Sequence, residues 1–429
     1  MIRFLYNLFW PLGLLFFLPA YFAKMIRRGG YREKFGQRVG IYDAEVRNRL
    51  SNQRSTWLHA VSVGEVNIAL KLANALRGLE PDLRCALTTT TTTGFALARK
   101  TAPPWIEVMY TPLDYWPVMR RAFSVLRPAR IVLVEAEVWP NVAAAAHVRR
   151  IPLALVNARL SPRSERRYRR FRFFVAPTFQ FLDLVCVPER RDVERWAALG
   201  VSRNRIHVTG SIKFDPNVQA QSKAVVASVS DAFNSGSSIL FGGSTHRGEE
   251  EILARVFLRL REQFPSLRLF IAPRHVERLQ EIRAQLGALP LRVTLASEAL
   301  TCGTADADCM LLDTTGELQL WYGIATVVFI GKSLTAHGGQ NPVEPILAGK
   351  PVVFGPHMEN FATLAKTLVS SNGVIQVSDA DSLERAVAEL LRDSEARQLL
   401  VQNANAALSE HKGGTARTAK LVHEFGPRH

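Results

Sequence analysis

The sequence predicts an α/β protein made of two doubly wound halves, and three observations support this fold class. The chain has 429 residues, more than the one to two hundred of an ordinary domain. Short aliphatic runs typical of buried parallel strands alternate with amphipathic helical patterns. The alternation stops at Asp215 and resumes at Ile239, after a hydrophilic stretch typical of an interdomain connection with a short helix. We therefore expect two Rossmann-like domains, residues 29–215 and 216–429, that face a central cleft.

The first half is predicted to contain five strands and one main helix. The strands are 57–61, 85–90, 131–134, 153–156 and 184–187, and the helix is 66–79. Ile131–Val134 is typical of a parallel strand covered on both faces, because every residue in it is aliphatic. The helix has apolar residues at helical spacing, which predicts one buried face.

The second half repeats this alternation. Its strands are 239–241, 267–272, 309–312, 327–330 and 351–354, and its clearest helices are 249–264 and 316–322. Hydrophobic residues make up 47% of the chain and charged residues 21%, which is enough apolar sequence for two packed cores.

The first residues differ from the rest of the chain. Phe4–Ala23 is nearly unbroken apolar sequence, close to the ~20 residues that span a bilayer. We expect residues 1–28 to be a membrane anchor with the domains on the cytoplasmic side, because basic residues behind the segment outnumber those in front. Pro11, Pro19 and Asn7 weaken a spanning helix, so a shallow interfacial anchor stays open as the alternative.

The formal net charge of +16 implies an anionic partner. Nine arginines lie between Arg149 and Arg172 against the single acid Glu165, which indicates either a functional cationic patch or a solvated basic helix face. No recognisable nucleic-acid-binding module accompanies the charge, so nucleic acid is not an expected partner. The four cysteines lack the paired short spacings of zinc sites or disulfide frameworks, which favours a reducing compartment.

A first candidate site follows the first strand. Residues 59–65 (HAVSVGE) place a glycine and a glutamate where the strand ends and a helix begins. Near a helix N-terminus, Glu65 is suited to interact with the helix dipole, and that role alone would explain it. If the fold presents it to the cleft, its carboxylate is also suited to take the proton from an attacking hydroxyl.

A second candidate, residues 135–141 (EAEVWPN), directly follows the aliphatic strand. Residues two apart on an extended chain point the same way, so Glu135 and Glu137 are expected to face the cleft together. Two adjacent carboxylates repel, which a shared proton, a cation or an arginine relieves. In the structural alternative, one carboxylate caps the next helix and the other pairs with an arginine. A divalent metal at this pair stays open as a further alternative, although no third ligand stands at a spacing that indicates one.

In the second half, residues 241–250 (FGGSTHRGEE) run from a strand into a helix through Gly243 and Ser244. Such a turn exposes backbone N–H groups that can hold a phosphate, although the glycine spacing fits neither the P-loop nor the dinucleotide fingerprint. Arg274 and His275 follow another strand and add a cation and an imidazole at the same edge, with a surface salt bridge as the alternative.

The densest candidate is residues 331–360, which read GKSLTAHGGQNPVEPILAGKPVVFGPHMEN. The residues expected to contact a ligand are Gly338, Gly339, Gln340, Asn341 and Glu344. The glycines allow close approach of backbone to ligand, and the polar side chains can orient a nucleotide base or accept hydrogen bonds from ribose hydroxyls. So many conformationally special residues are hard to explain by packing alone, which predicts a ligand site.

Together these motifs resemble those of the bacterial 3-deoxy-manno-octulosonic acid (Kdo) transferases, which are glycosyltransferases of GT-B fold. The similarity covers nearly the whole chain and includes the N-terminal anchor, HAVSVGE, EAEVWPN, NARLSPRS, GSTHRGEE, APRH, GGQNPVEP and GPHMENF. The resemblance implies an inner-membrane enzyme of lipopolysaccharide inner-core biosynthesis. It implies transfer of Kdo from CMP-Kdo to a lipid A precursor (lipid IVA), with inversion and without a cofactor or metal.

The resemblance also implies residue roles, carried over by motif position. Glu65 is implied as the general base, and Glu135, with Glu137 as a further candidate, supports the acceptor side. The residues implied to surround the CMP moiety are Gly243, Ser244, Arg274, His275, Gly339, Gln340, Asn341 and Glu344. Two departures stand out: Ala136 replaces a threonine common in the family, which bears on acceptor fit, and Lys332 replaces a frequent glycine, which bears on neutralisation of the donor phosphate.

Two other classes compete with this reading. A sugar-nucleotide epimerase shares the architecture but needs neither a lipid anchor nor an acceptor-facing cationic patch. A membrane-tethered nucleic-acid-binding protein is suggested by the positive charge alone. The sequence does not specify the number of Kdo residues added, their linkage, the acyl state of the acceptor or the oligomeric state.

Overall fold

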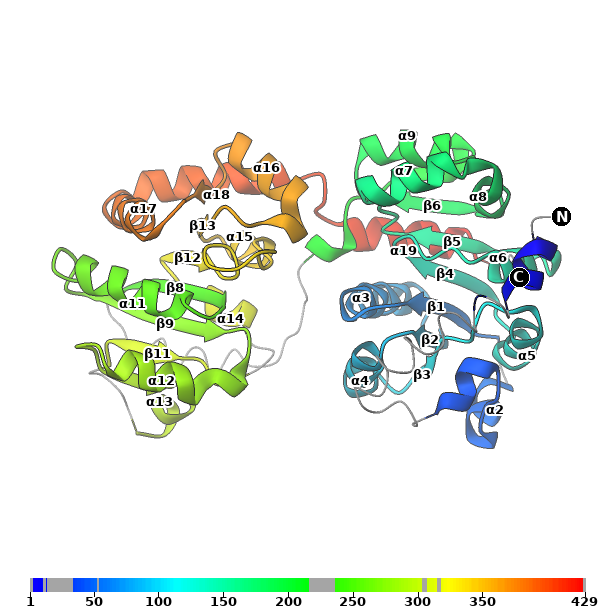
Figure 1. Ribbon diagram of the computed structural model, residues 1–429, viewed down its shortest axis with the longest axis horizontal. Helices are drawn as coiled ribbons and strands as arrows, with labels where there is room; N and C mark the ends of the chain where they lie inside the picture. Colours follow the sequence, from blue (N-terminus) through cyan, green and yellow to red (C-terminus); the bar gives the residue numbers. More distant parts are fainter. Residues whose placement is uncertain are drawn as a thin grey trace. The chain divides into compact units, whose positions relative to one another are not determined.

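The computed structural model describes residues 3–10, 13, 34–51, 54–215, 236–302, 307–314 and 318–426. The chain divides into two compact units (Figure 1). The first unit comprises Met1–Asp215 together with Glu410–His429, and the second comprises Pro216–Ser409. Among the described residues, each unit holds one seven-stranded sheet, and all strand pairings are parallel.

The first unit is built from the following elements. Its strands are β1 (Thr56–Ala60), β2 (Cys85–Thr89), β3 (Ile106–Tyr110), β4 (Arg130–Val134), β5 (Leu153–Val156), β6 (Leu184–Val187) and β7 (Ile206–Val208). Its helices are α2 (Ala44–Ser51), α3 (Val63–Leu79), α4 (Thr92–Thr101), α5 (Trp116–Leu126), α6 (Pro140–Val148), α7 (Pro162–Arg170), α8 (Arg172–Phe179), α9 (Arg190–Ala198) and α19 (Gly414–Glu424). Short 3-10 helices are η1 (Phe35–Val39), η2 (Arg203–Arg205) and η3 (Ile212–Phe214). The strand order is β3-β2-β1-β4-β5-β6-β7.

The second unit has its own set of elements. Its strands are β8 (Ser238–Thr245), β9 (Leu267–Pro273), β10 (Val293–Leu295), β11 (Cys309–Leu311), β12 (Val327–Ile330), β13 (Val352–Phe354) and β14 (Ile375–Gln376). Its helices are α11 (Glu249–Leu260), α12 (Leu279–Gly287), α13 (Ala296–Cys302), α14 (Leu318–Tyr322), α15 (Val343–Leu347), α16 (Ala362–Ser370), α17 (Ala380–Arg392) and α18 (Ser394–Leu408). Short 3-10 helices are η4 (Val276–Arg278) and η5 (Glu359–Phe361). The strand order is β10-β11-β9-β8-β12-β13-β14.

Strand β4 shows why these sheets carry aliphatic runs. Side chains alternate between the two faces of a strand. Ile131 and Leu133 pack in one hydrophobic core of the first unit, whereas Val132 and Val134 pack in the other. A strand with a core on each face needs apolar residues at every position, as the sequence predicted.

All ten predicted strands are present, and the predicted α/β class is confirmed. The structure adds β3, β7, β10 and β14, which are the edge strands of the two sheets. An edge strand has one strand neighbour, and these four are short or interrupted by polar residues, such as Glu107 in β3. They therefore lack the continuous apolar signal of the central strands.

The C-terminal segment differs from the predicted domain division, which placed all of 216–429 in the second domain. Helix α19, at the red end of the colour bar, belongs to the first unit (Figure 1). Its Ala419 and Val422 are buried in a core of that unit. The Asp215 carboxylate accepts a hydrogen bond from the Gly413 amide at 2.8 Å. These contacts return the chain end to the first unit.

The N-terminal segment is described only in part. Residues 3–10 are helical, and we call them the N-terminal helix. Residues 1–2, 11–12 and 14–28 of the predicted anchor, and 217–235 of the predicted connection, lie outside the described residues. Within the part of the chain that is described, no helix combines the length and the apolar character needed to cross a membrane.

Candidate functional site

Glu65 lies at the head of α3, directly after β1. Ser62 is the N-cap residue, and its hydroxyl accepts from the Glu65 amide at 3.4 Å and donates to the Glu65 carboxylate at 2.8 Å. The Val61 amide donates to the other carboxylate oxygen at 2.9 Å. Glu65 is 8% exposed. The capping role left open by the sequence is therefore present. A carboxylate accepts about four hydrogen bonds, so these two orient it without saturating it.

The threonines after β2 support this turn. The hydroxyls of Thr89 and Thr91 donate to the Val61 carbonyl at 3.2 and 3.1 Å. A Cβ on Gly94 would lie 2.7 Å from the Thr89 hydroxyl oxygen and 2.8 Å from that of Thr91, so a glycine is required there. This supporting role of the threonines was not predicted from the sequence.

Glu135 and Glu137 follow β4, the strand paired with β1. Glu135 has a φ of 62°, and Glu135 and Ala136 form a turn. The predicted geometry, with both carboxylates projecting from one extended strand, is therefore wrong. A non-glycine residue in left-handed backbone costs ~1–2 kcal/mol, and such strain is concentrated at functional sites.

The structure nevertheless places the three glutamates in one electrostatic group. Burial raises the pKa of Glu137 to about 7, and the negative charges of Glu65 and Glu135 act in the same direction. Burial and the charge of Glu65 also raise the pKa of Glu135, against the opposing charges of Lys213 and Arg159. Among the described residues, neither Glu135 nor Glu137 forms an ion pair. The first unit thus holds an acidic cluster at the carboxyl ends of β1 and β4, in which Glu65 is buried and Glu135 and Glu137 are half-buried.

Asp114 caps helix α6 in place of the motif glutamates. Its carboxylate accepts from the amides of Asn141 at 3.0 Å and Val142 at 2.9 Å. Burial raises the pKa of Asp114 to about 6. The alternative in which Glu135 or Glu137 caps this helix is therefore excluded.

The N-terminal helix is joined to the same motif. Asn7 and Asn141 exchange side-chain hydrogen bonds of 2.9 and 3.0 Å. Trp10 stacks on Tyr115 with ring centroids 5.0 Å apart. Asn7, the polar residue that weakened the prediction of a spanning helix, is thus a residue that attaches the N-terminal helix to the first unit.

All nine arginines between Arg149 and Arg172 are exposed. Arg169 pairs with Glu165 at 2.9 Å on α7. Among the arginines lie exposed aromatic rings, with Phe173 70% exposed. The following residues are called the Arg–Phe patch: Arg163, Arg166, Arg167, Arg169, Arg170, Phe171, Arg172, Phe173 and Phe174. Exposed aromatic rings gathered among cations are typical of an interaction surface.

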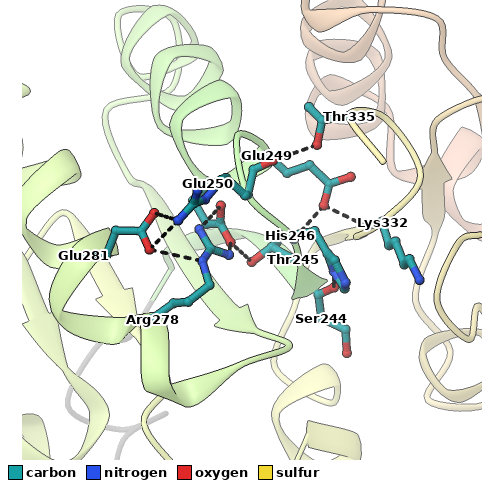
Figure 2. Close-up of polar contacts among 10 residues, drawn as sticks. Ser244, Thr245, His246, Glu249, Glu250, Arg278, Glu281, Lys332 and Thr335 are labelled. Carbon is teal, nitrogen blue, oxygen red and sulfur yellow. Dashed lines mark hydrogen bonds and ion pairs between the residues drawn. The ribbon is translucent and has the colours of Figure 1, made fainter. Parts of the chain in front are cut away.

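In the second unit, Glu249 opens α11 and joins the turns after β8 and β12 (Figure 2). It is fully buried. Its carboxylate accepts from the backbone amides of His246, Lys332, Ser333 and Leu334, at 2.8, 2.7, 2.9 and 3.0 Å. The N-terminal end of α11 adds further favourable charge. The His246 amide, one of those expected to be open to a phosphate, is therefore already bound by a carboxylate.

The buried charge of Glu250 also has close partners. Glu250 is 1% exposed, and its carboxylate accepts from the Thr245 hydroxyl at 3.0 Å and pairs with Arg278 at 3.1 Å (Figure 2). The sequence prediction assigned no role to either glutamate of this pair. The sequence feature that could have pointed to them is a run of three glutamates in the first turn of a helix, directly after Gly248, whose φ is 91°.

Several side chains remain available for a ligand at this edge. Arg274 and His275 are exposed after β9, and Ser244 is half-buried with a φ of 54°. Among the described residues, neither Arg274 nor Lys332 has an ion-pair partner, so the predicted alternative of a surface salt bridge at Arg274 is not formed. A Cβ on Gly243 would lie 2.4 Å from the hydroxyl oxygen of Tyr322, which explains this glycine by packing.

The two glycines before the 340–344 segment have positive φ values, 123° at Gly338 and 68° at Gly339. A Cβ on Gly339 would lie 2.4 Å from the Met358 sulfur, and one on Gly338 would lie 2.8 Å from the Asn360 amide nitrogen. These two positions therefore require glycine because the protein's own turn at 357–360 packs closely against them, and no ligand is needed to explain the glycines.

The polar residues of this segment are prearranged. The Asn341 side chain accepts from the Val343 amide at 3.1 Å and donates to the Glu344 carboxylate at 3.2 Å. The Gln340 amide donates to the Gly331 carbonyl at 3.1 Å. Glu344 lies in the first turn of α15, as the sequence suggested, and is half-buried.

Comparison with known proteins gives a consistent family. A model described as 3-deoxy-D-manno-octulosonic-acid transferase (kdotransferase) matches residues 33–216. The chain is 32% identical over 396 residues to the 3-deoxy-D-manno-octulosonic acid transferase of Haemophilus influenzae, with 92% of each chain covered.

Solved structures share the architecture. The glycosyltransferase of kitacinnamycin matches with a TM-score of 0.54 and 16% identity, over 88% of this chain and 100% of that one. A UDP-GlcNAc 2-epimerase from Neisseria meningitidis, bound to UDP-GlcNAc, matches with a TM-score of 0.59 and 12% identity, over 87% and 99%. Likeness at these identities shows the fold alone. The near full-length match at 32% identity decides the family: the chain belongs to the 3-deoxy-D-manno-octulosonic acid transferases and is a glycosyltransferase enzyme.

Proposed function

We propose that this enzyme transfers Kdo from CMP-Kdo to a lipid A precursor, lipid IVA, in lipopolysaccharide inner-core synthesis. The observation that carries the proposal is the buried Glu65 carboxylate, oriented by two hydrogen bonds at the carboxyl edge of a parallel sheet. Ligands of such sheets bind at that edge. The reaction uses no cofactor, because CMP-Kdo carries its own leaving group.

The donor is assigned to the second unit. Its phosphate suits the exposed Arg274 guanidinium and the Ser244 hydroxyl. The hydrogen-bonded Asn341–Glu344 pair suits the hydroxyls of a ribose. When the bond between Kdo and phosphate breaks, CMP gains negative charge. Arg274, which has no ion-pair partner among the described residues, offsets that charge.

Glu65 is assigned the proton transfer. The anomeric carbon of Kdo loses its bond to the phosphate oxygen and gains one to the acceptor hydroxyl oxygen on the opposite face, which inverts its configuration. The hydroxyl proton moves to Glu65, and CMP leaves with the electron pair of the broken bond. A positioned base of this kind contributes ~10²–10⁴ in rate.

Glu135 and Glu137 are assigned to the acceptor side. With its pKa raised to about 7, Glu137 carries a proton in much of the protein at neutral pH. A protonated carboxyl can donate a hydrogen bond to a sugar hydroxyl and adds no negative charge beside Glu65. The left-handed backbone at Glu135 directs that carboxyl into the same cluster.

The Arg–Phe patch and the N-terminal helix are assigned to the membrane side. The guanidinium groups of the patch match phosphates of the acceptor and of an anionic leaflet. Its phenylalanine rings gain free energy on leaving water. The N-terminal helix exposes Phe4, Leu8 and Phe9, which suits contact with lipid at the cytoplasmic face of the inner membrane.

The direct test uses the purified full-length protein, CMP-Kdo and lipid IVA in detergent. We expect CMP release in step with a product whose mass is raised by whole Kdo units, and NMR should show the inverted anomeric configuration. A variant with an exposed glutamate removed, Glu251→Ala, should react as the unmodified enzyme does. Conversion of the sugar nucleotide without a glycosylated lipid would contradict the proposal and favour an epimerase.

A further inference from the structure

A cluster outside the assigned roles lies on the turns that flank the two positive-φ glycines. His337, His357 and Glu359 bring their ligand atoms within 4.8 Å of one another. The Nδ1 atoms of His337 and His357 lie 3.0 and 3.5 Å from the same carboxylate oxygen, Oε1 of Glu359. The two imidazole rings are 4.0 Å apart between centroids. Two imidazoles and one carboxylate therefore converge on one point.

The spacing fits a small transition cation. Zinc binds imidazole nitrogen and carboxylate oxygen at ~2.0–2.2 Å, and a tetrahedron with such bonds has edges of ~3.3 Å. The two measured nitrogen–oxygen separations, 3.0 and 3.5 Å, lie on either side of that edge. Two histidines and one carboxylate form a known zinc donor set that leaves the fourth position open.

The other oxygen of the Glu359 carboxylate has a hydrogen-bond donor of its own. The Gly338 amide donates to Oε2 of Glu359 at 2.6 Å, so Oε1 stays turned toward the histidines. Hydrogen bonds of this kind orient metal ligands in proteins.

We propose that His337, His357 and Glu359 form a binding site for a divalent transition cation of the zinc class, with a fourth position open to water or a phosphate oxygen. The three ligands come from the turn before Gly338 and from the turn at 357–359. A bound cation would cross-link these two turns. Any effect of this cross-link on the donor rests on the function proposed above, whereas cation binding itself does not.

The simpler alternative is a surface ion pair between a protonated His337 and Glu359. The first unit contains a matched example, since His423 Nδ1 lies 2.7 Å from the Glu80 carboxylate. There, an arginine, Arg130, occupies the other side of the carboxylate at 2.7 Å. That pair has one imidazole and a competing cation, so it should not bind a metal ion.

The test is titration of tag-free, chelator-treated full-length protein with Zn²⁺ by calorimetry and with Co²⁺ by visible absorption. We expect one equivalent to bind, with the d–d absorption of Co²⁺ in a nitrogen–oxygen site of low coordination number. His357→Ala and Glu359→Gln should each weaken binding by at least ~10-fold, a loss of ~1.4 kcal/mol. The Gln side chain still offers the Gly338 amide an acceptor, so the turn is kept. The control His423→Ala should leave the affinity unchanged.

Absence of saturable binding, or equal affinity in the unmodified protein and both ligand variants, would overturn the site and leave an ion pair only. The assay contains neither CMP-Kdo nor acceptor. Failure of the proposed transfer reaction would therefore leave this result intact, and failure of metal binding would leave the transfer proposal intact.

Discussion

Each sheet has buried glutamates at its carboxyl edge, but the two groups of carboxylates differ in their hydrogen-bond and ion-pair partners. In the second unit, Glu249 accepts hydrogen bonds from four backbone amides, and Glu250 has an arginine and a hydroxyl as partners. In the first unit, Glu65 accepts from two donors. Glu135 and Glu137 have raised pKa values and no ion-pair partner among the described residues.

This difference distinguishes carboxylates that hold the backbone from those that have acceptor positions free for a substrate. A buried charge whose acceptor positions are filled by fixed donors holds the backbone in place. A carboxylate with spare acceptor positions is suited to accept a hydrogen bond, and then a proton, from a substrate hydroxyl. By burial alone, Glu249 would be a better candidate base than Glu65. Glu65 is the better candidate because its carboxylate accepts two hydrogen bonds, whereas that of Glu249 accepts four. Substitutions in each class should therefore differ in what they change.

The largest expected effect comes from Glu65→Gln. Glutamine keeps the size of the side chain and one acceptor but cannot take the hydroxyl proton. We expect the rate of transfer in single-turnover measurements to fall by ~10²–10⁴. Loss of the favourable interaction with the head of α3 should lower stability by no more than ~1 kcal/mol. Activity within ~10-fold of the unmodified enzyme would remove Glu65 from the role of base.

Glu249→Ala should act on stability. The substitution leaves four backbone amides without their acceptor, and we expect the free energy of unfolding to fall by ~3–5 kcal/mol. Chemical denaturation followed by circular dichroism measures this loss. The neighbouring Glu251→Ala is the matched control, because Glu251 is half exposed and pairs with Arg255 on the surface, and it should change stability by less than ~1 kcal/mol. Equal effects of the two variants would contradict the structural role of Glu249.

Glu137→Gln should reveal the acidic cluster through pH. Because the pKa of Glu137 is raised from 4.5 to about 7 in the folded protein, the folded state binds more protons than the unfolded state between these values. Stability is therefore lost as the pH rises through this window. Removing the charge should raise stability by ~1–3 kcal/mol at pH 8 and change it little at pH 5. Thermal melts at both pH values check this, and a gain of equal size at pH 5 would contradict it.

The smallest expected effect is at the Arg–Phe patch. Phe173→Ser combined with Phe174→Ser removes two exposed rings and leaves every arginine in place. We expect binding to vesicles that contain anionic lipid to weaken by about 10-fold, while CMP affinity stays the same. Sedimentation of the protein with vesicles measures the change. Unchanged partition would show that the rings do not enter lipid.

The sequence predicted the central strands well because they carry runs of apolar residues, as in β4, where Ile131–Val134 packs into a core on each face. It missed β3, β7, β10 and β14, since edge strands tolerate residues such as Glu107 and Gln376. It also assigned the C-terminal residues to the second domain, whereas Glu410–His429 belong to the first unit, because no local pattern indicates which core receives Ala419 and Val422.

In the candidate site, the sequence indicated which motif residues to expect, but it did not indicate which other residues surround them. The position of Glu65 at a strand-to-helix turn followed from Gly64 and the preceding strand. The left-handed backbone of Glu135 was not predictable, because a non-glycine residue adopts it only where tertiary contacts enforce it. The four amides around Glu249 come from segments far apart in the sequence, and no local pattern brings them together.

The central claim is that the second unit binds the donor and the first unit transfers the proton. Its most direct test is CMP affinity, measured by calorimetry on the unmodified protein, Glu65→Gln and Arg274→Ala. The donor assignment to the second unit predicts that Glu65→Gln keeps the dissociation constant within ~2-fold, while Arg274→Ala raises it by at least ~10-fold. A large loss of CMP affinity in Glu65→Gln, with Arg274→Ala unaffected, would contradict the assignment of the donor to the second unit and of proton transfer to the first.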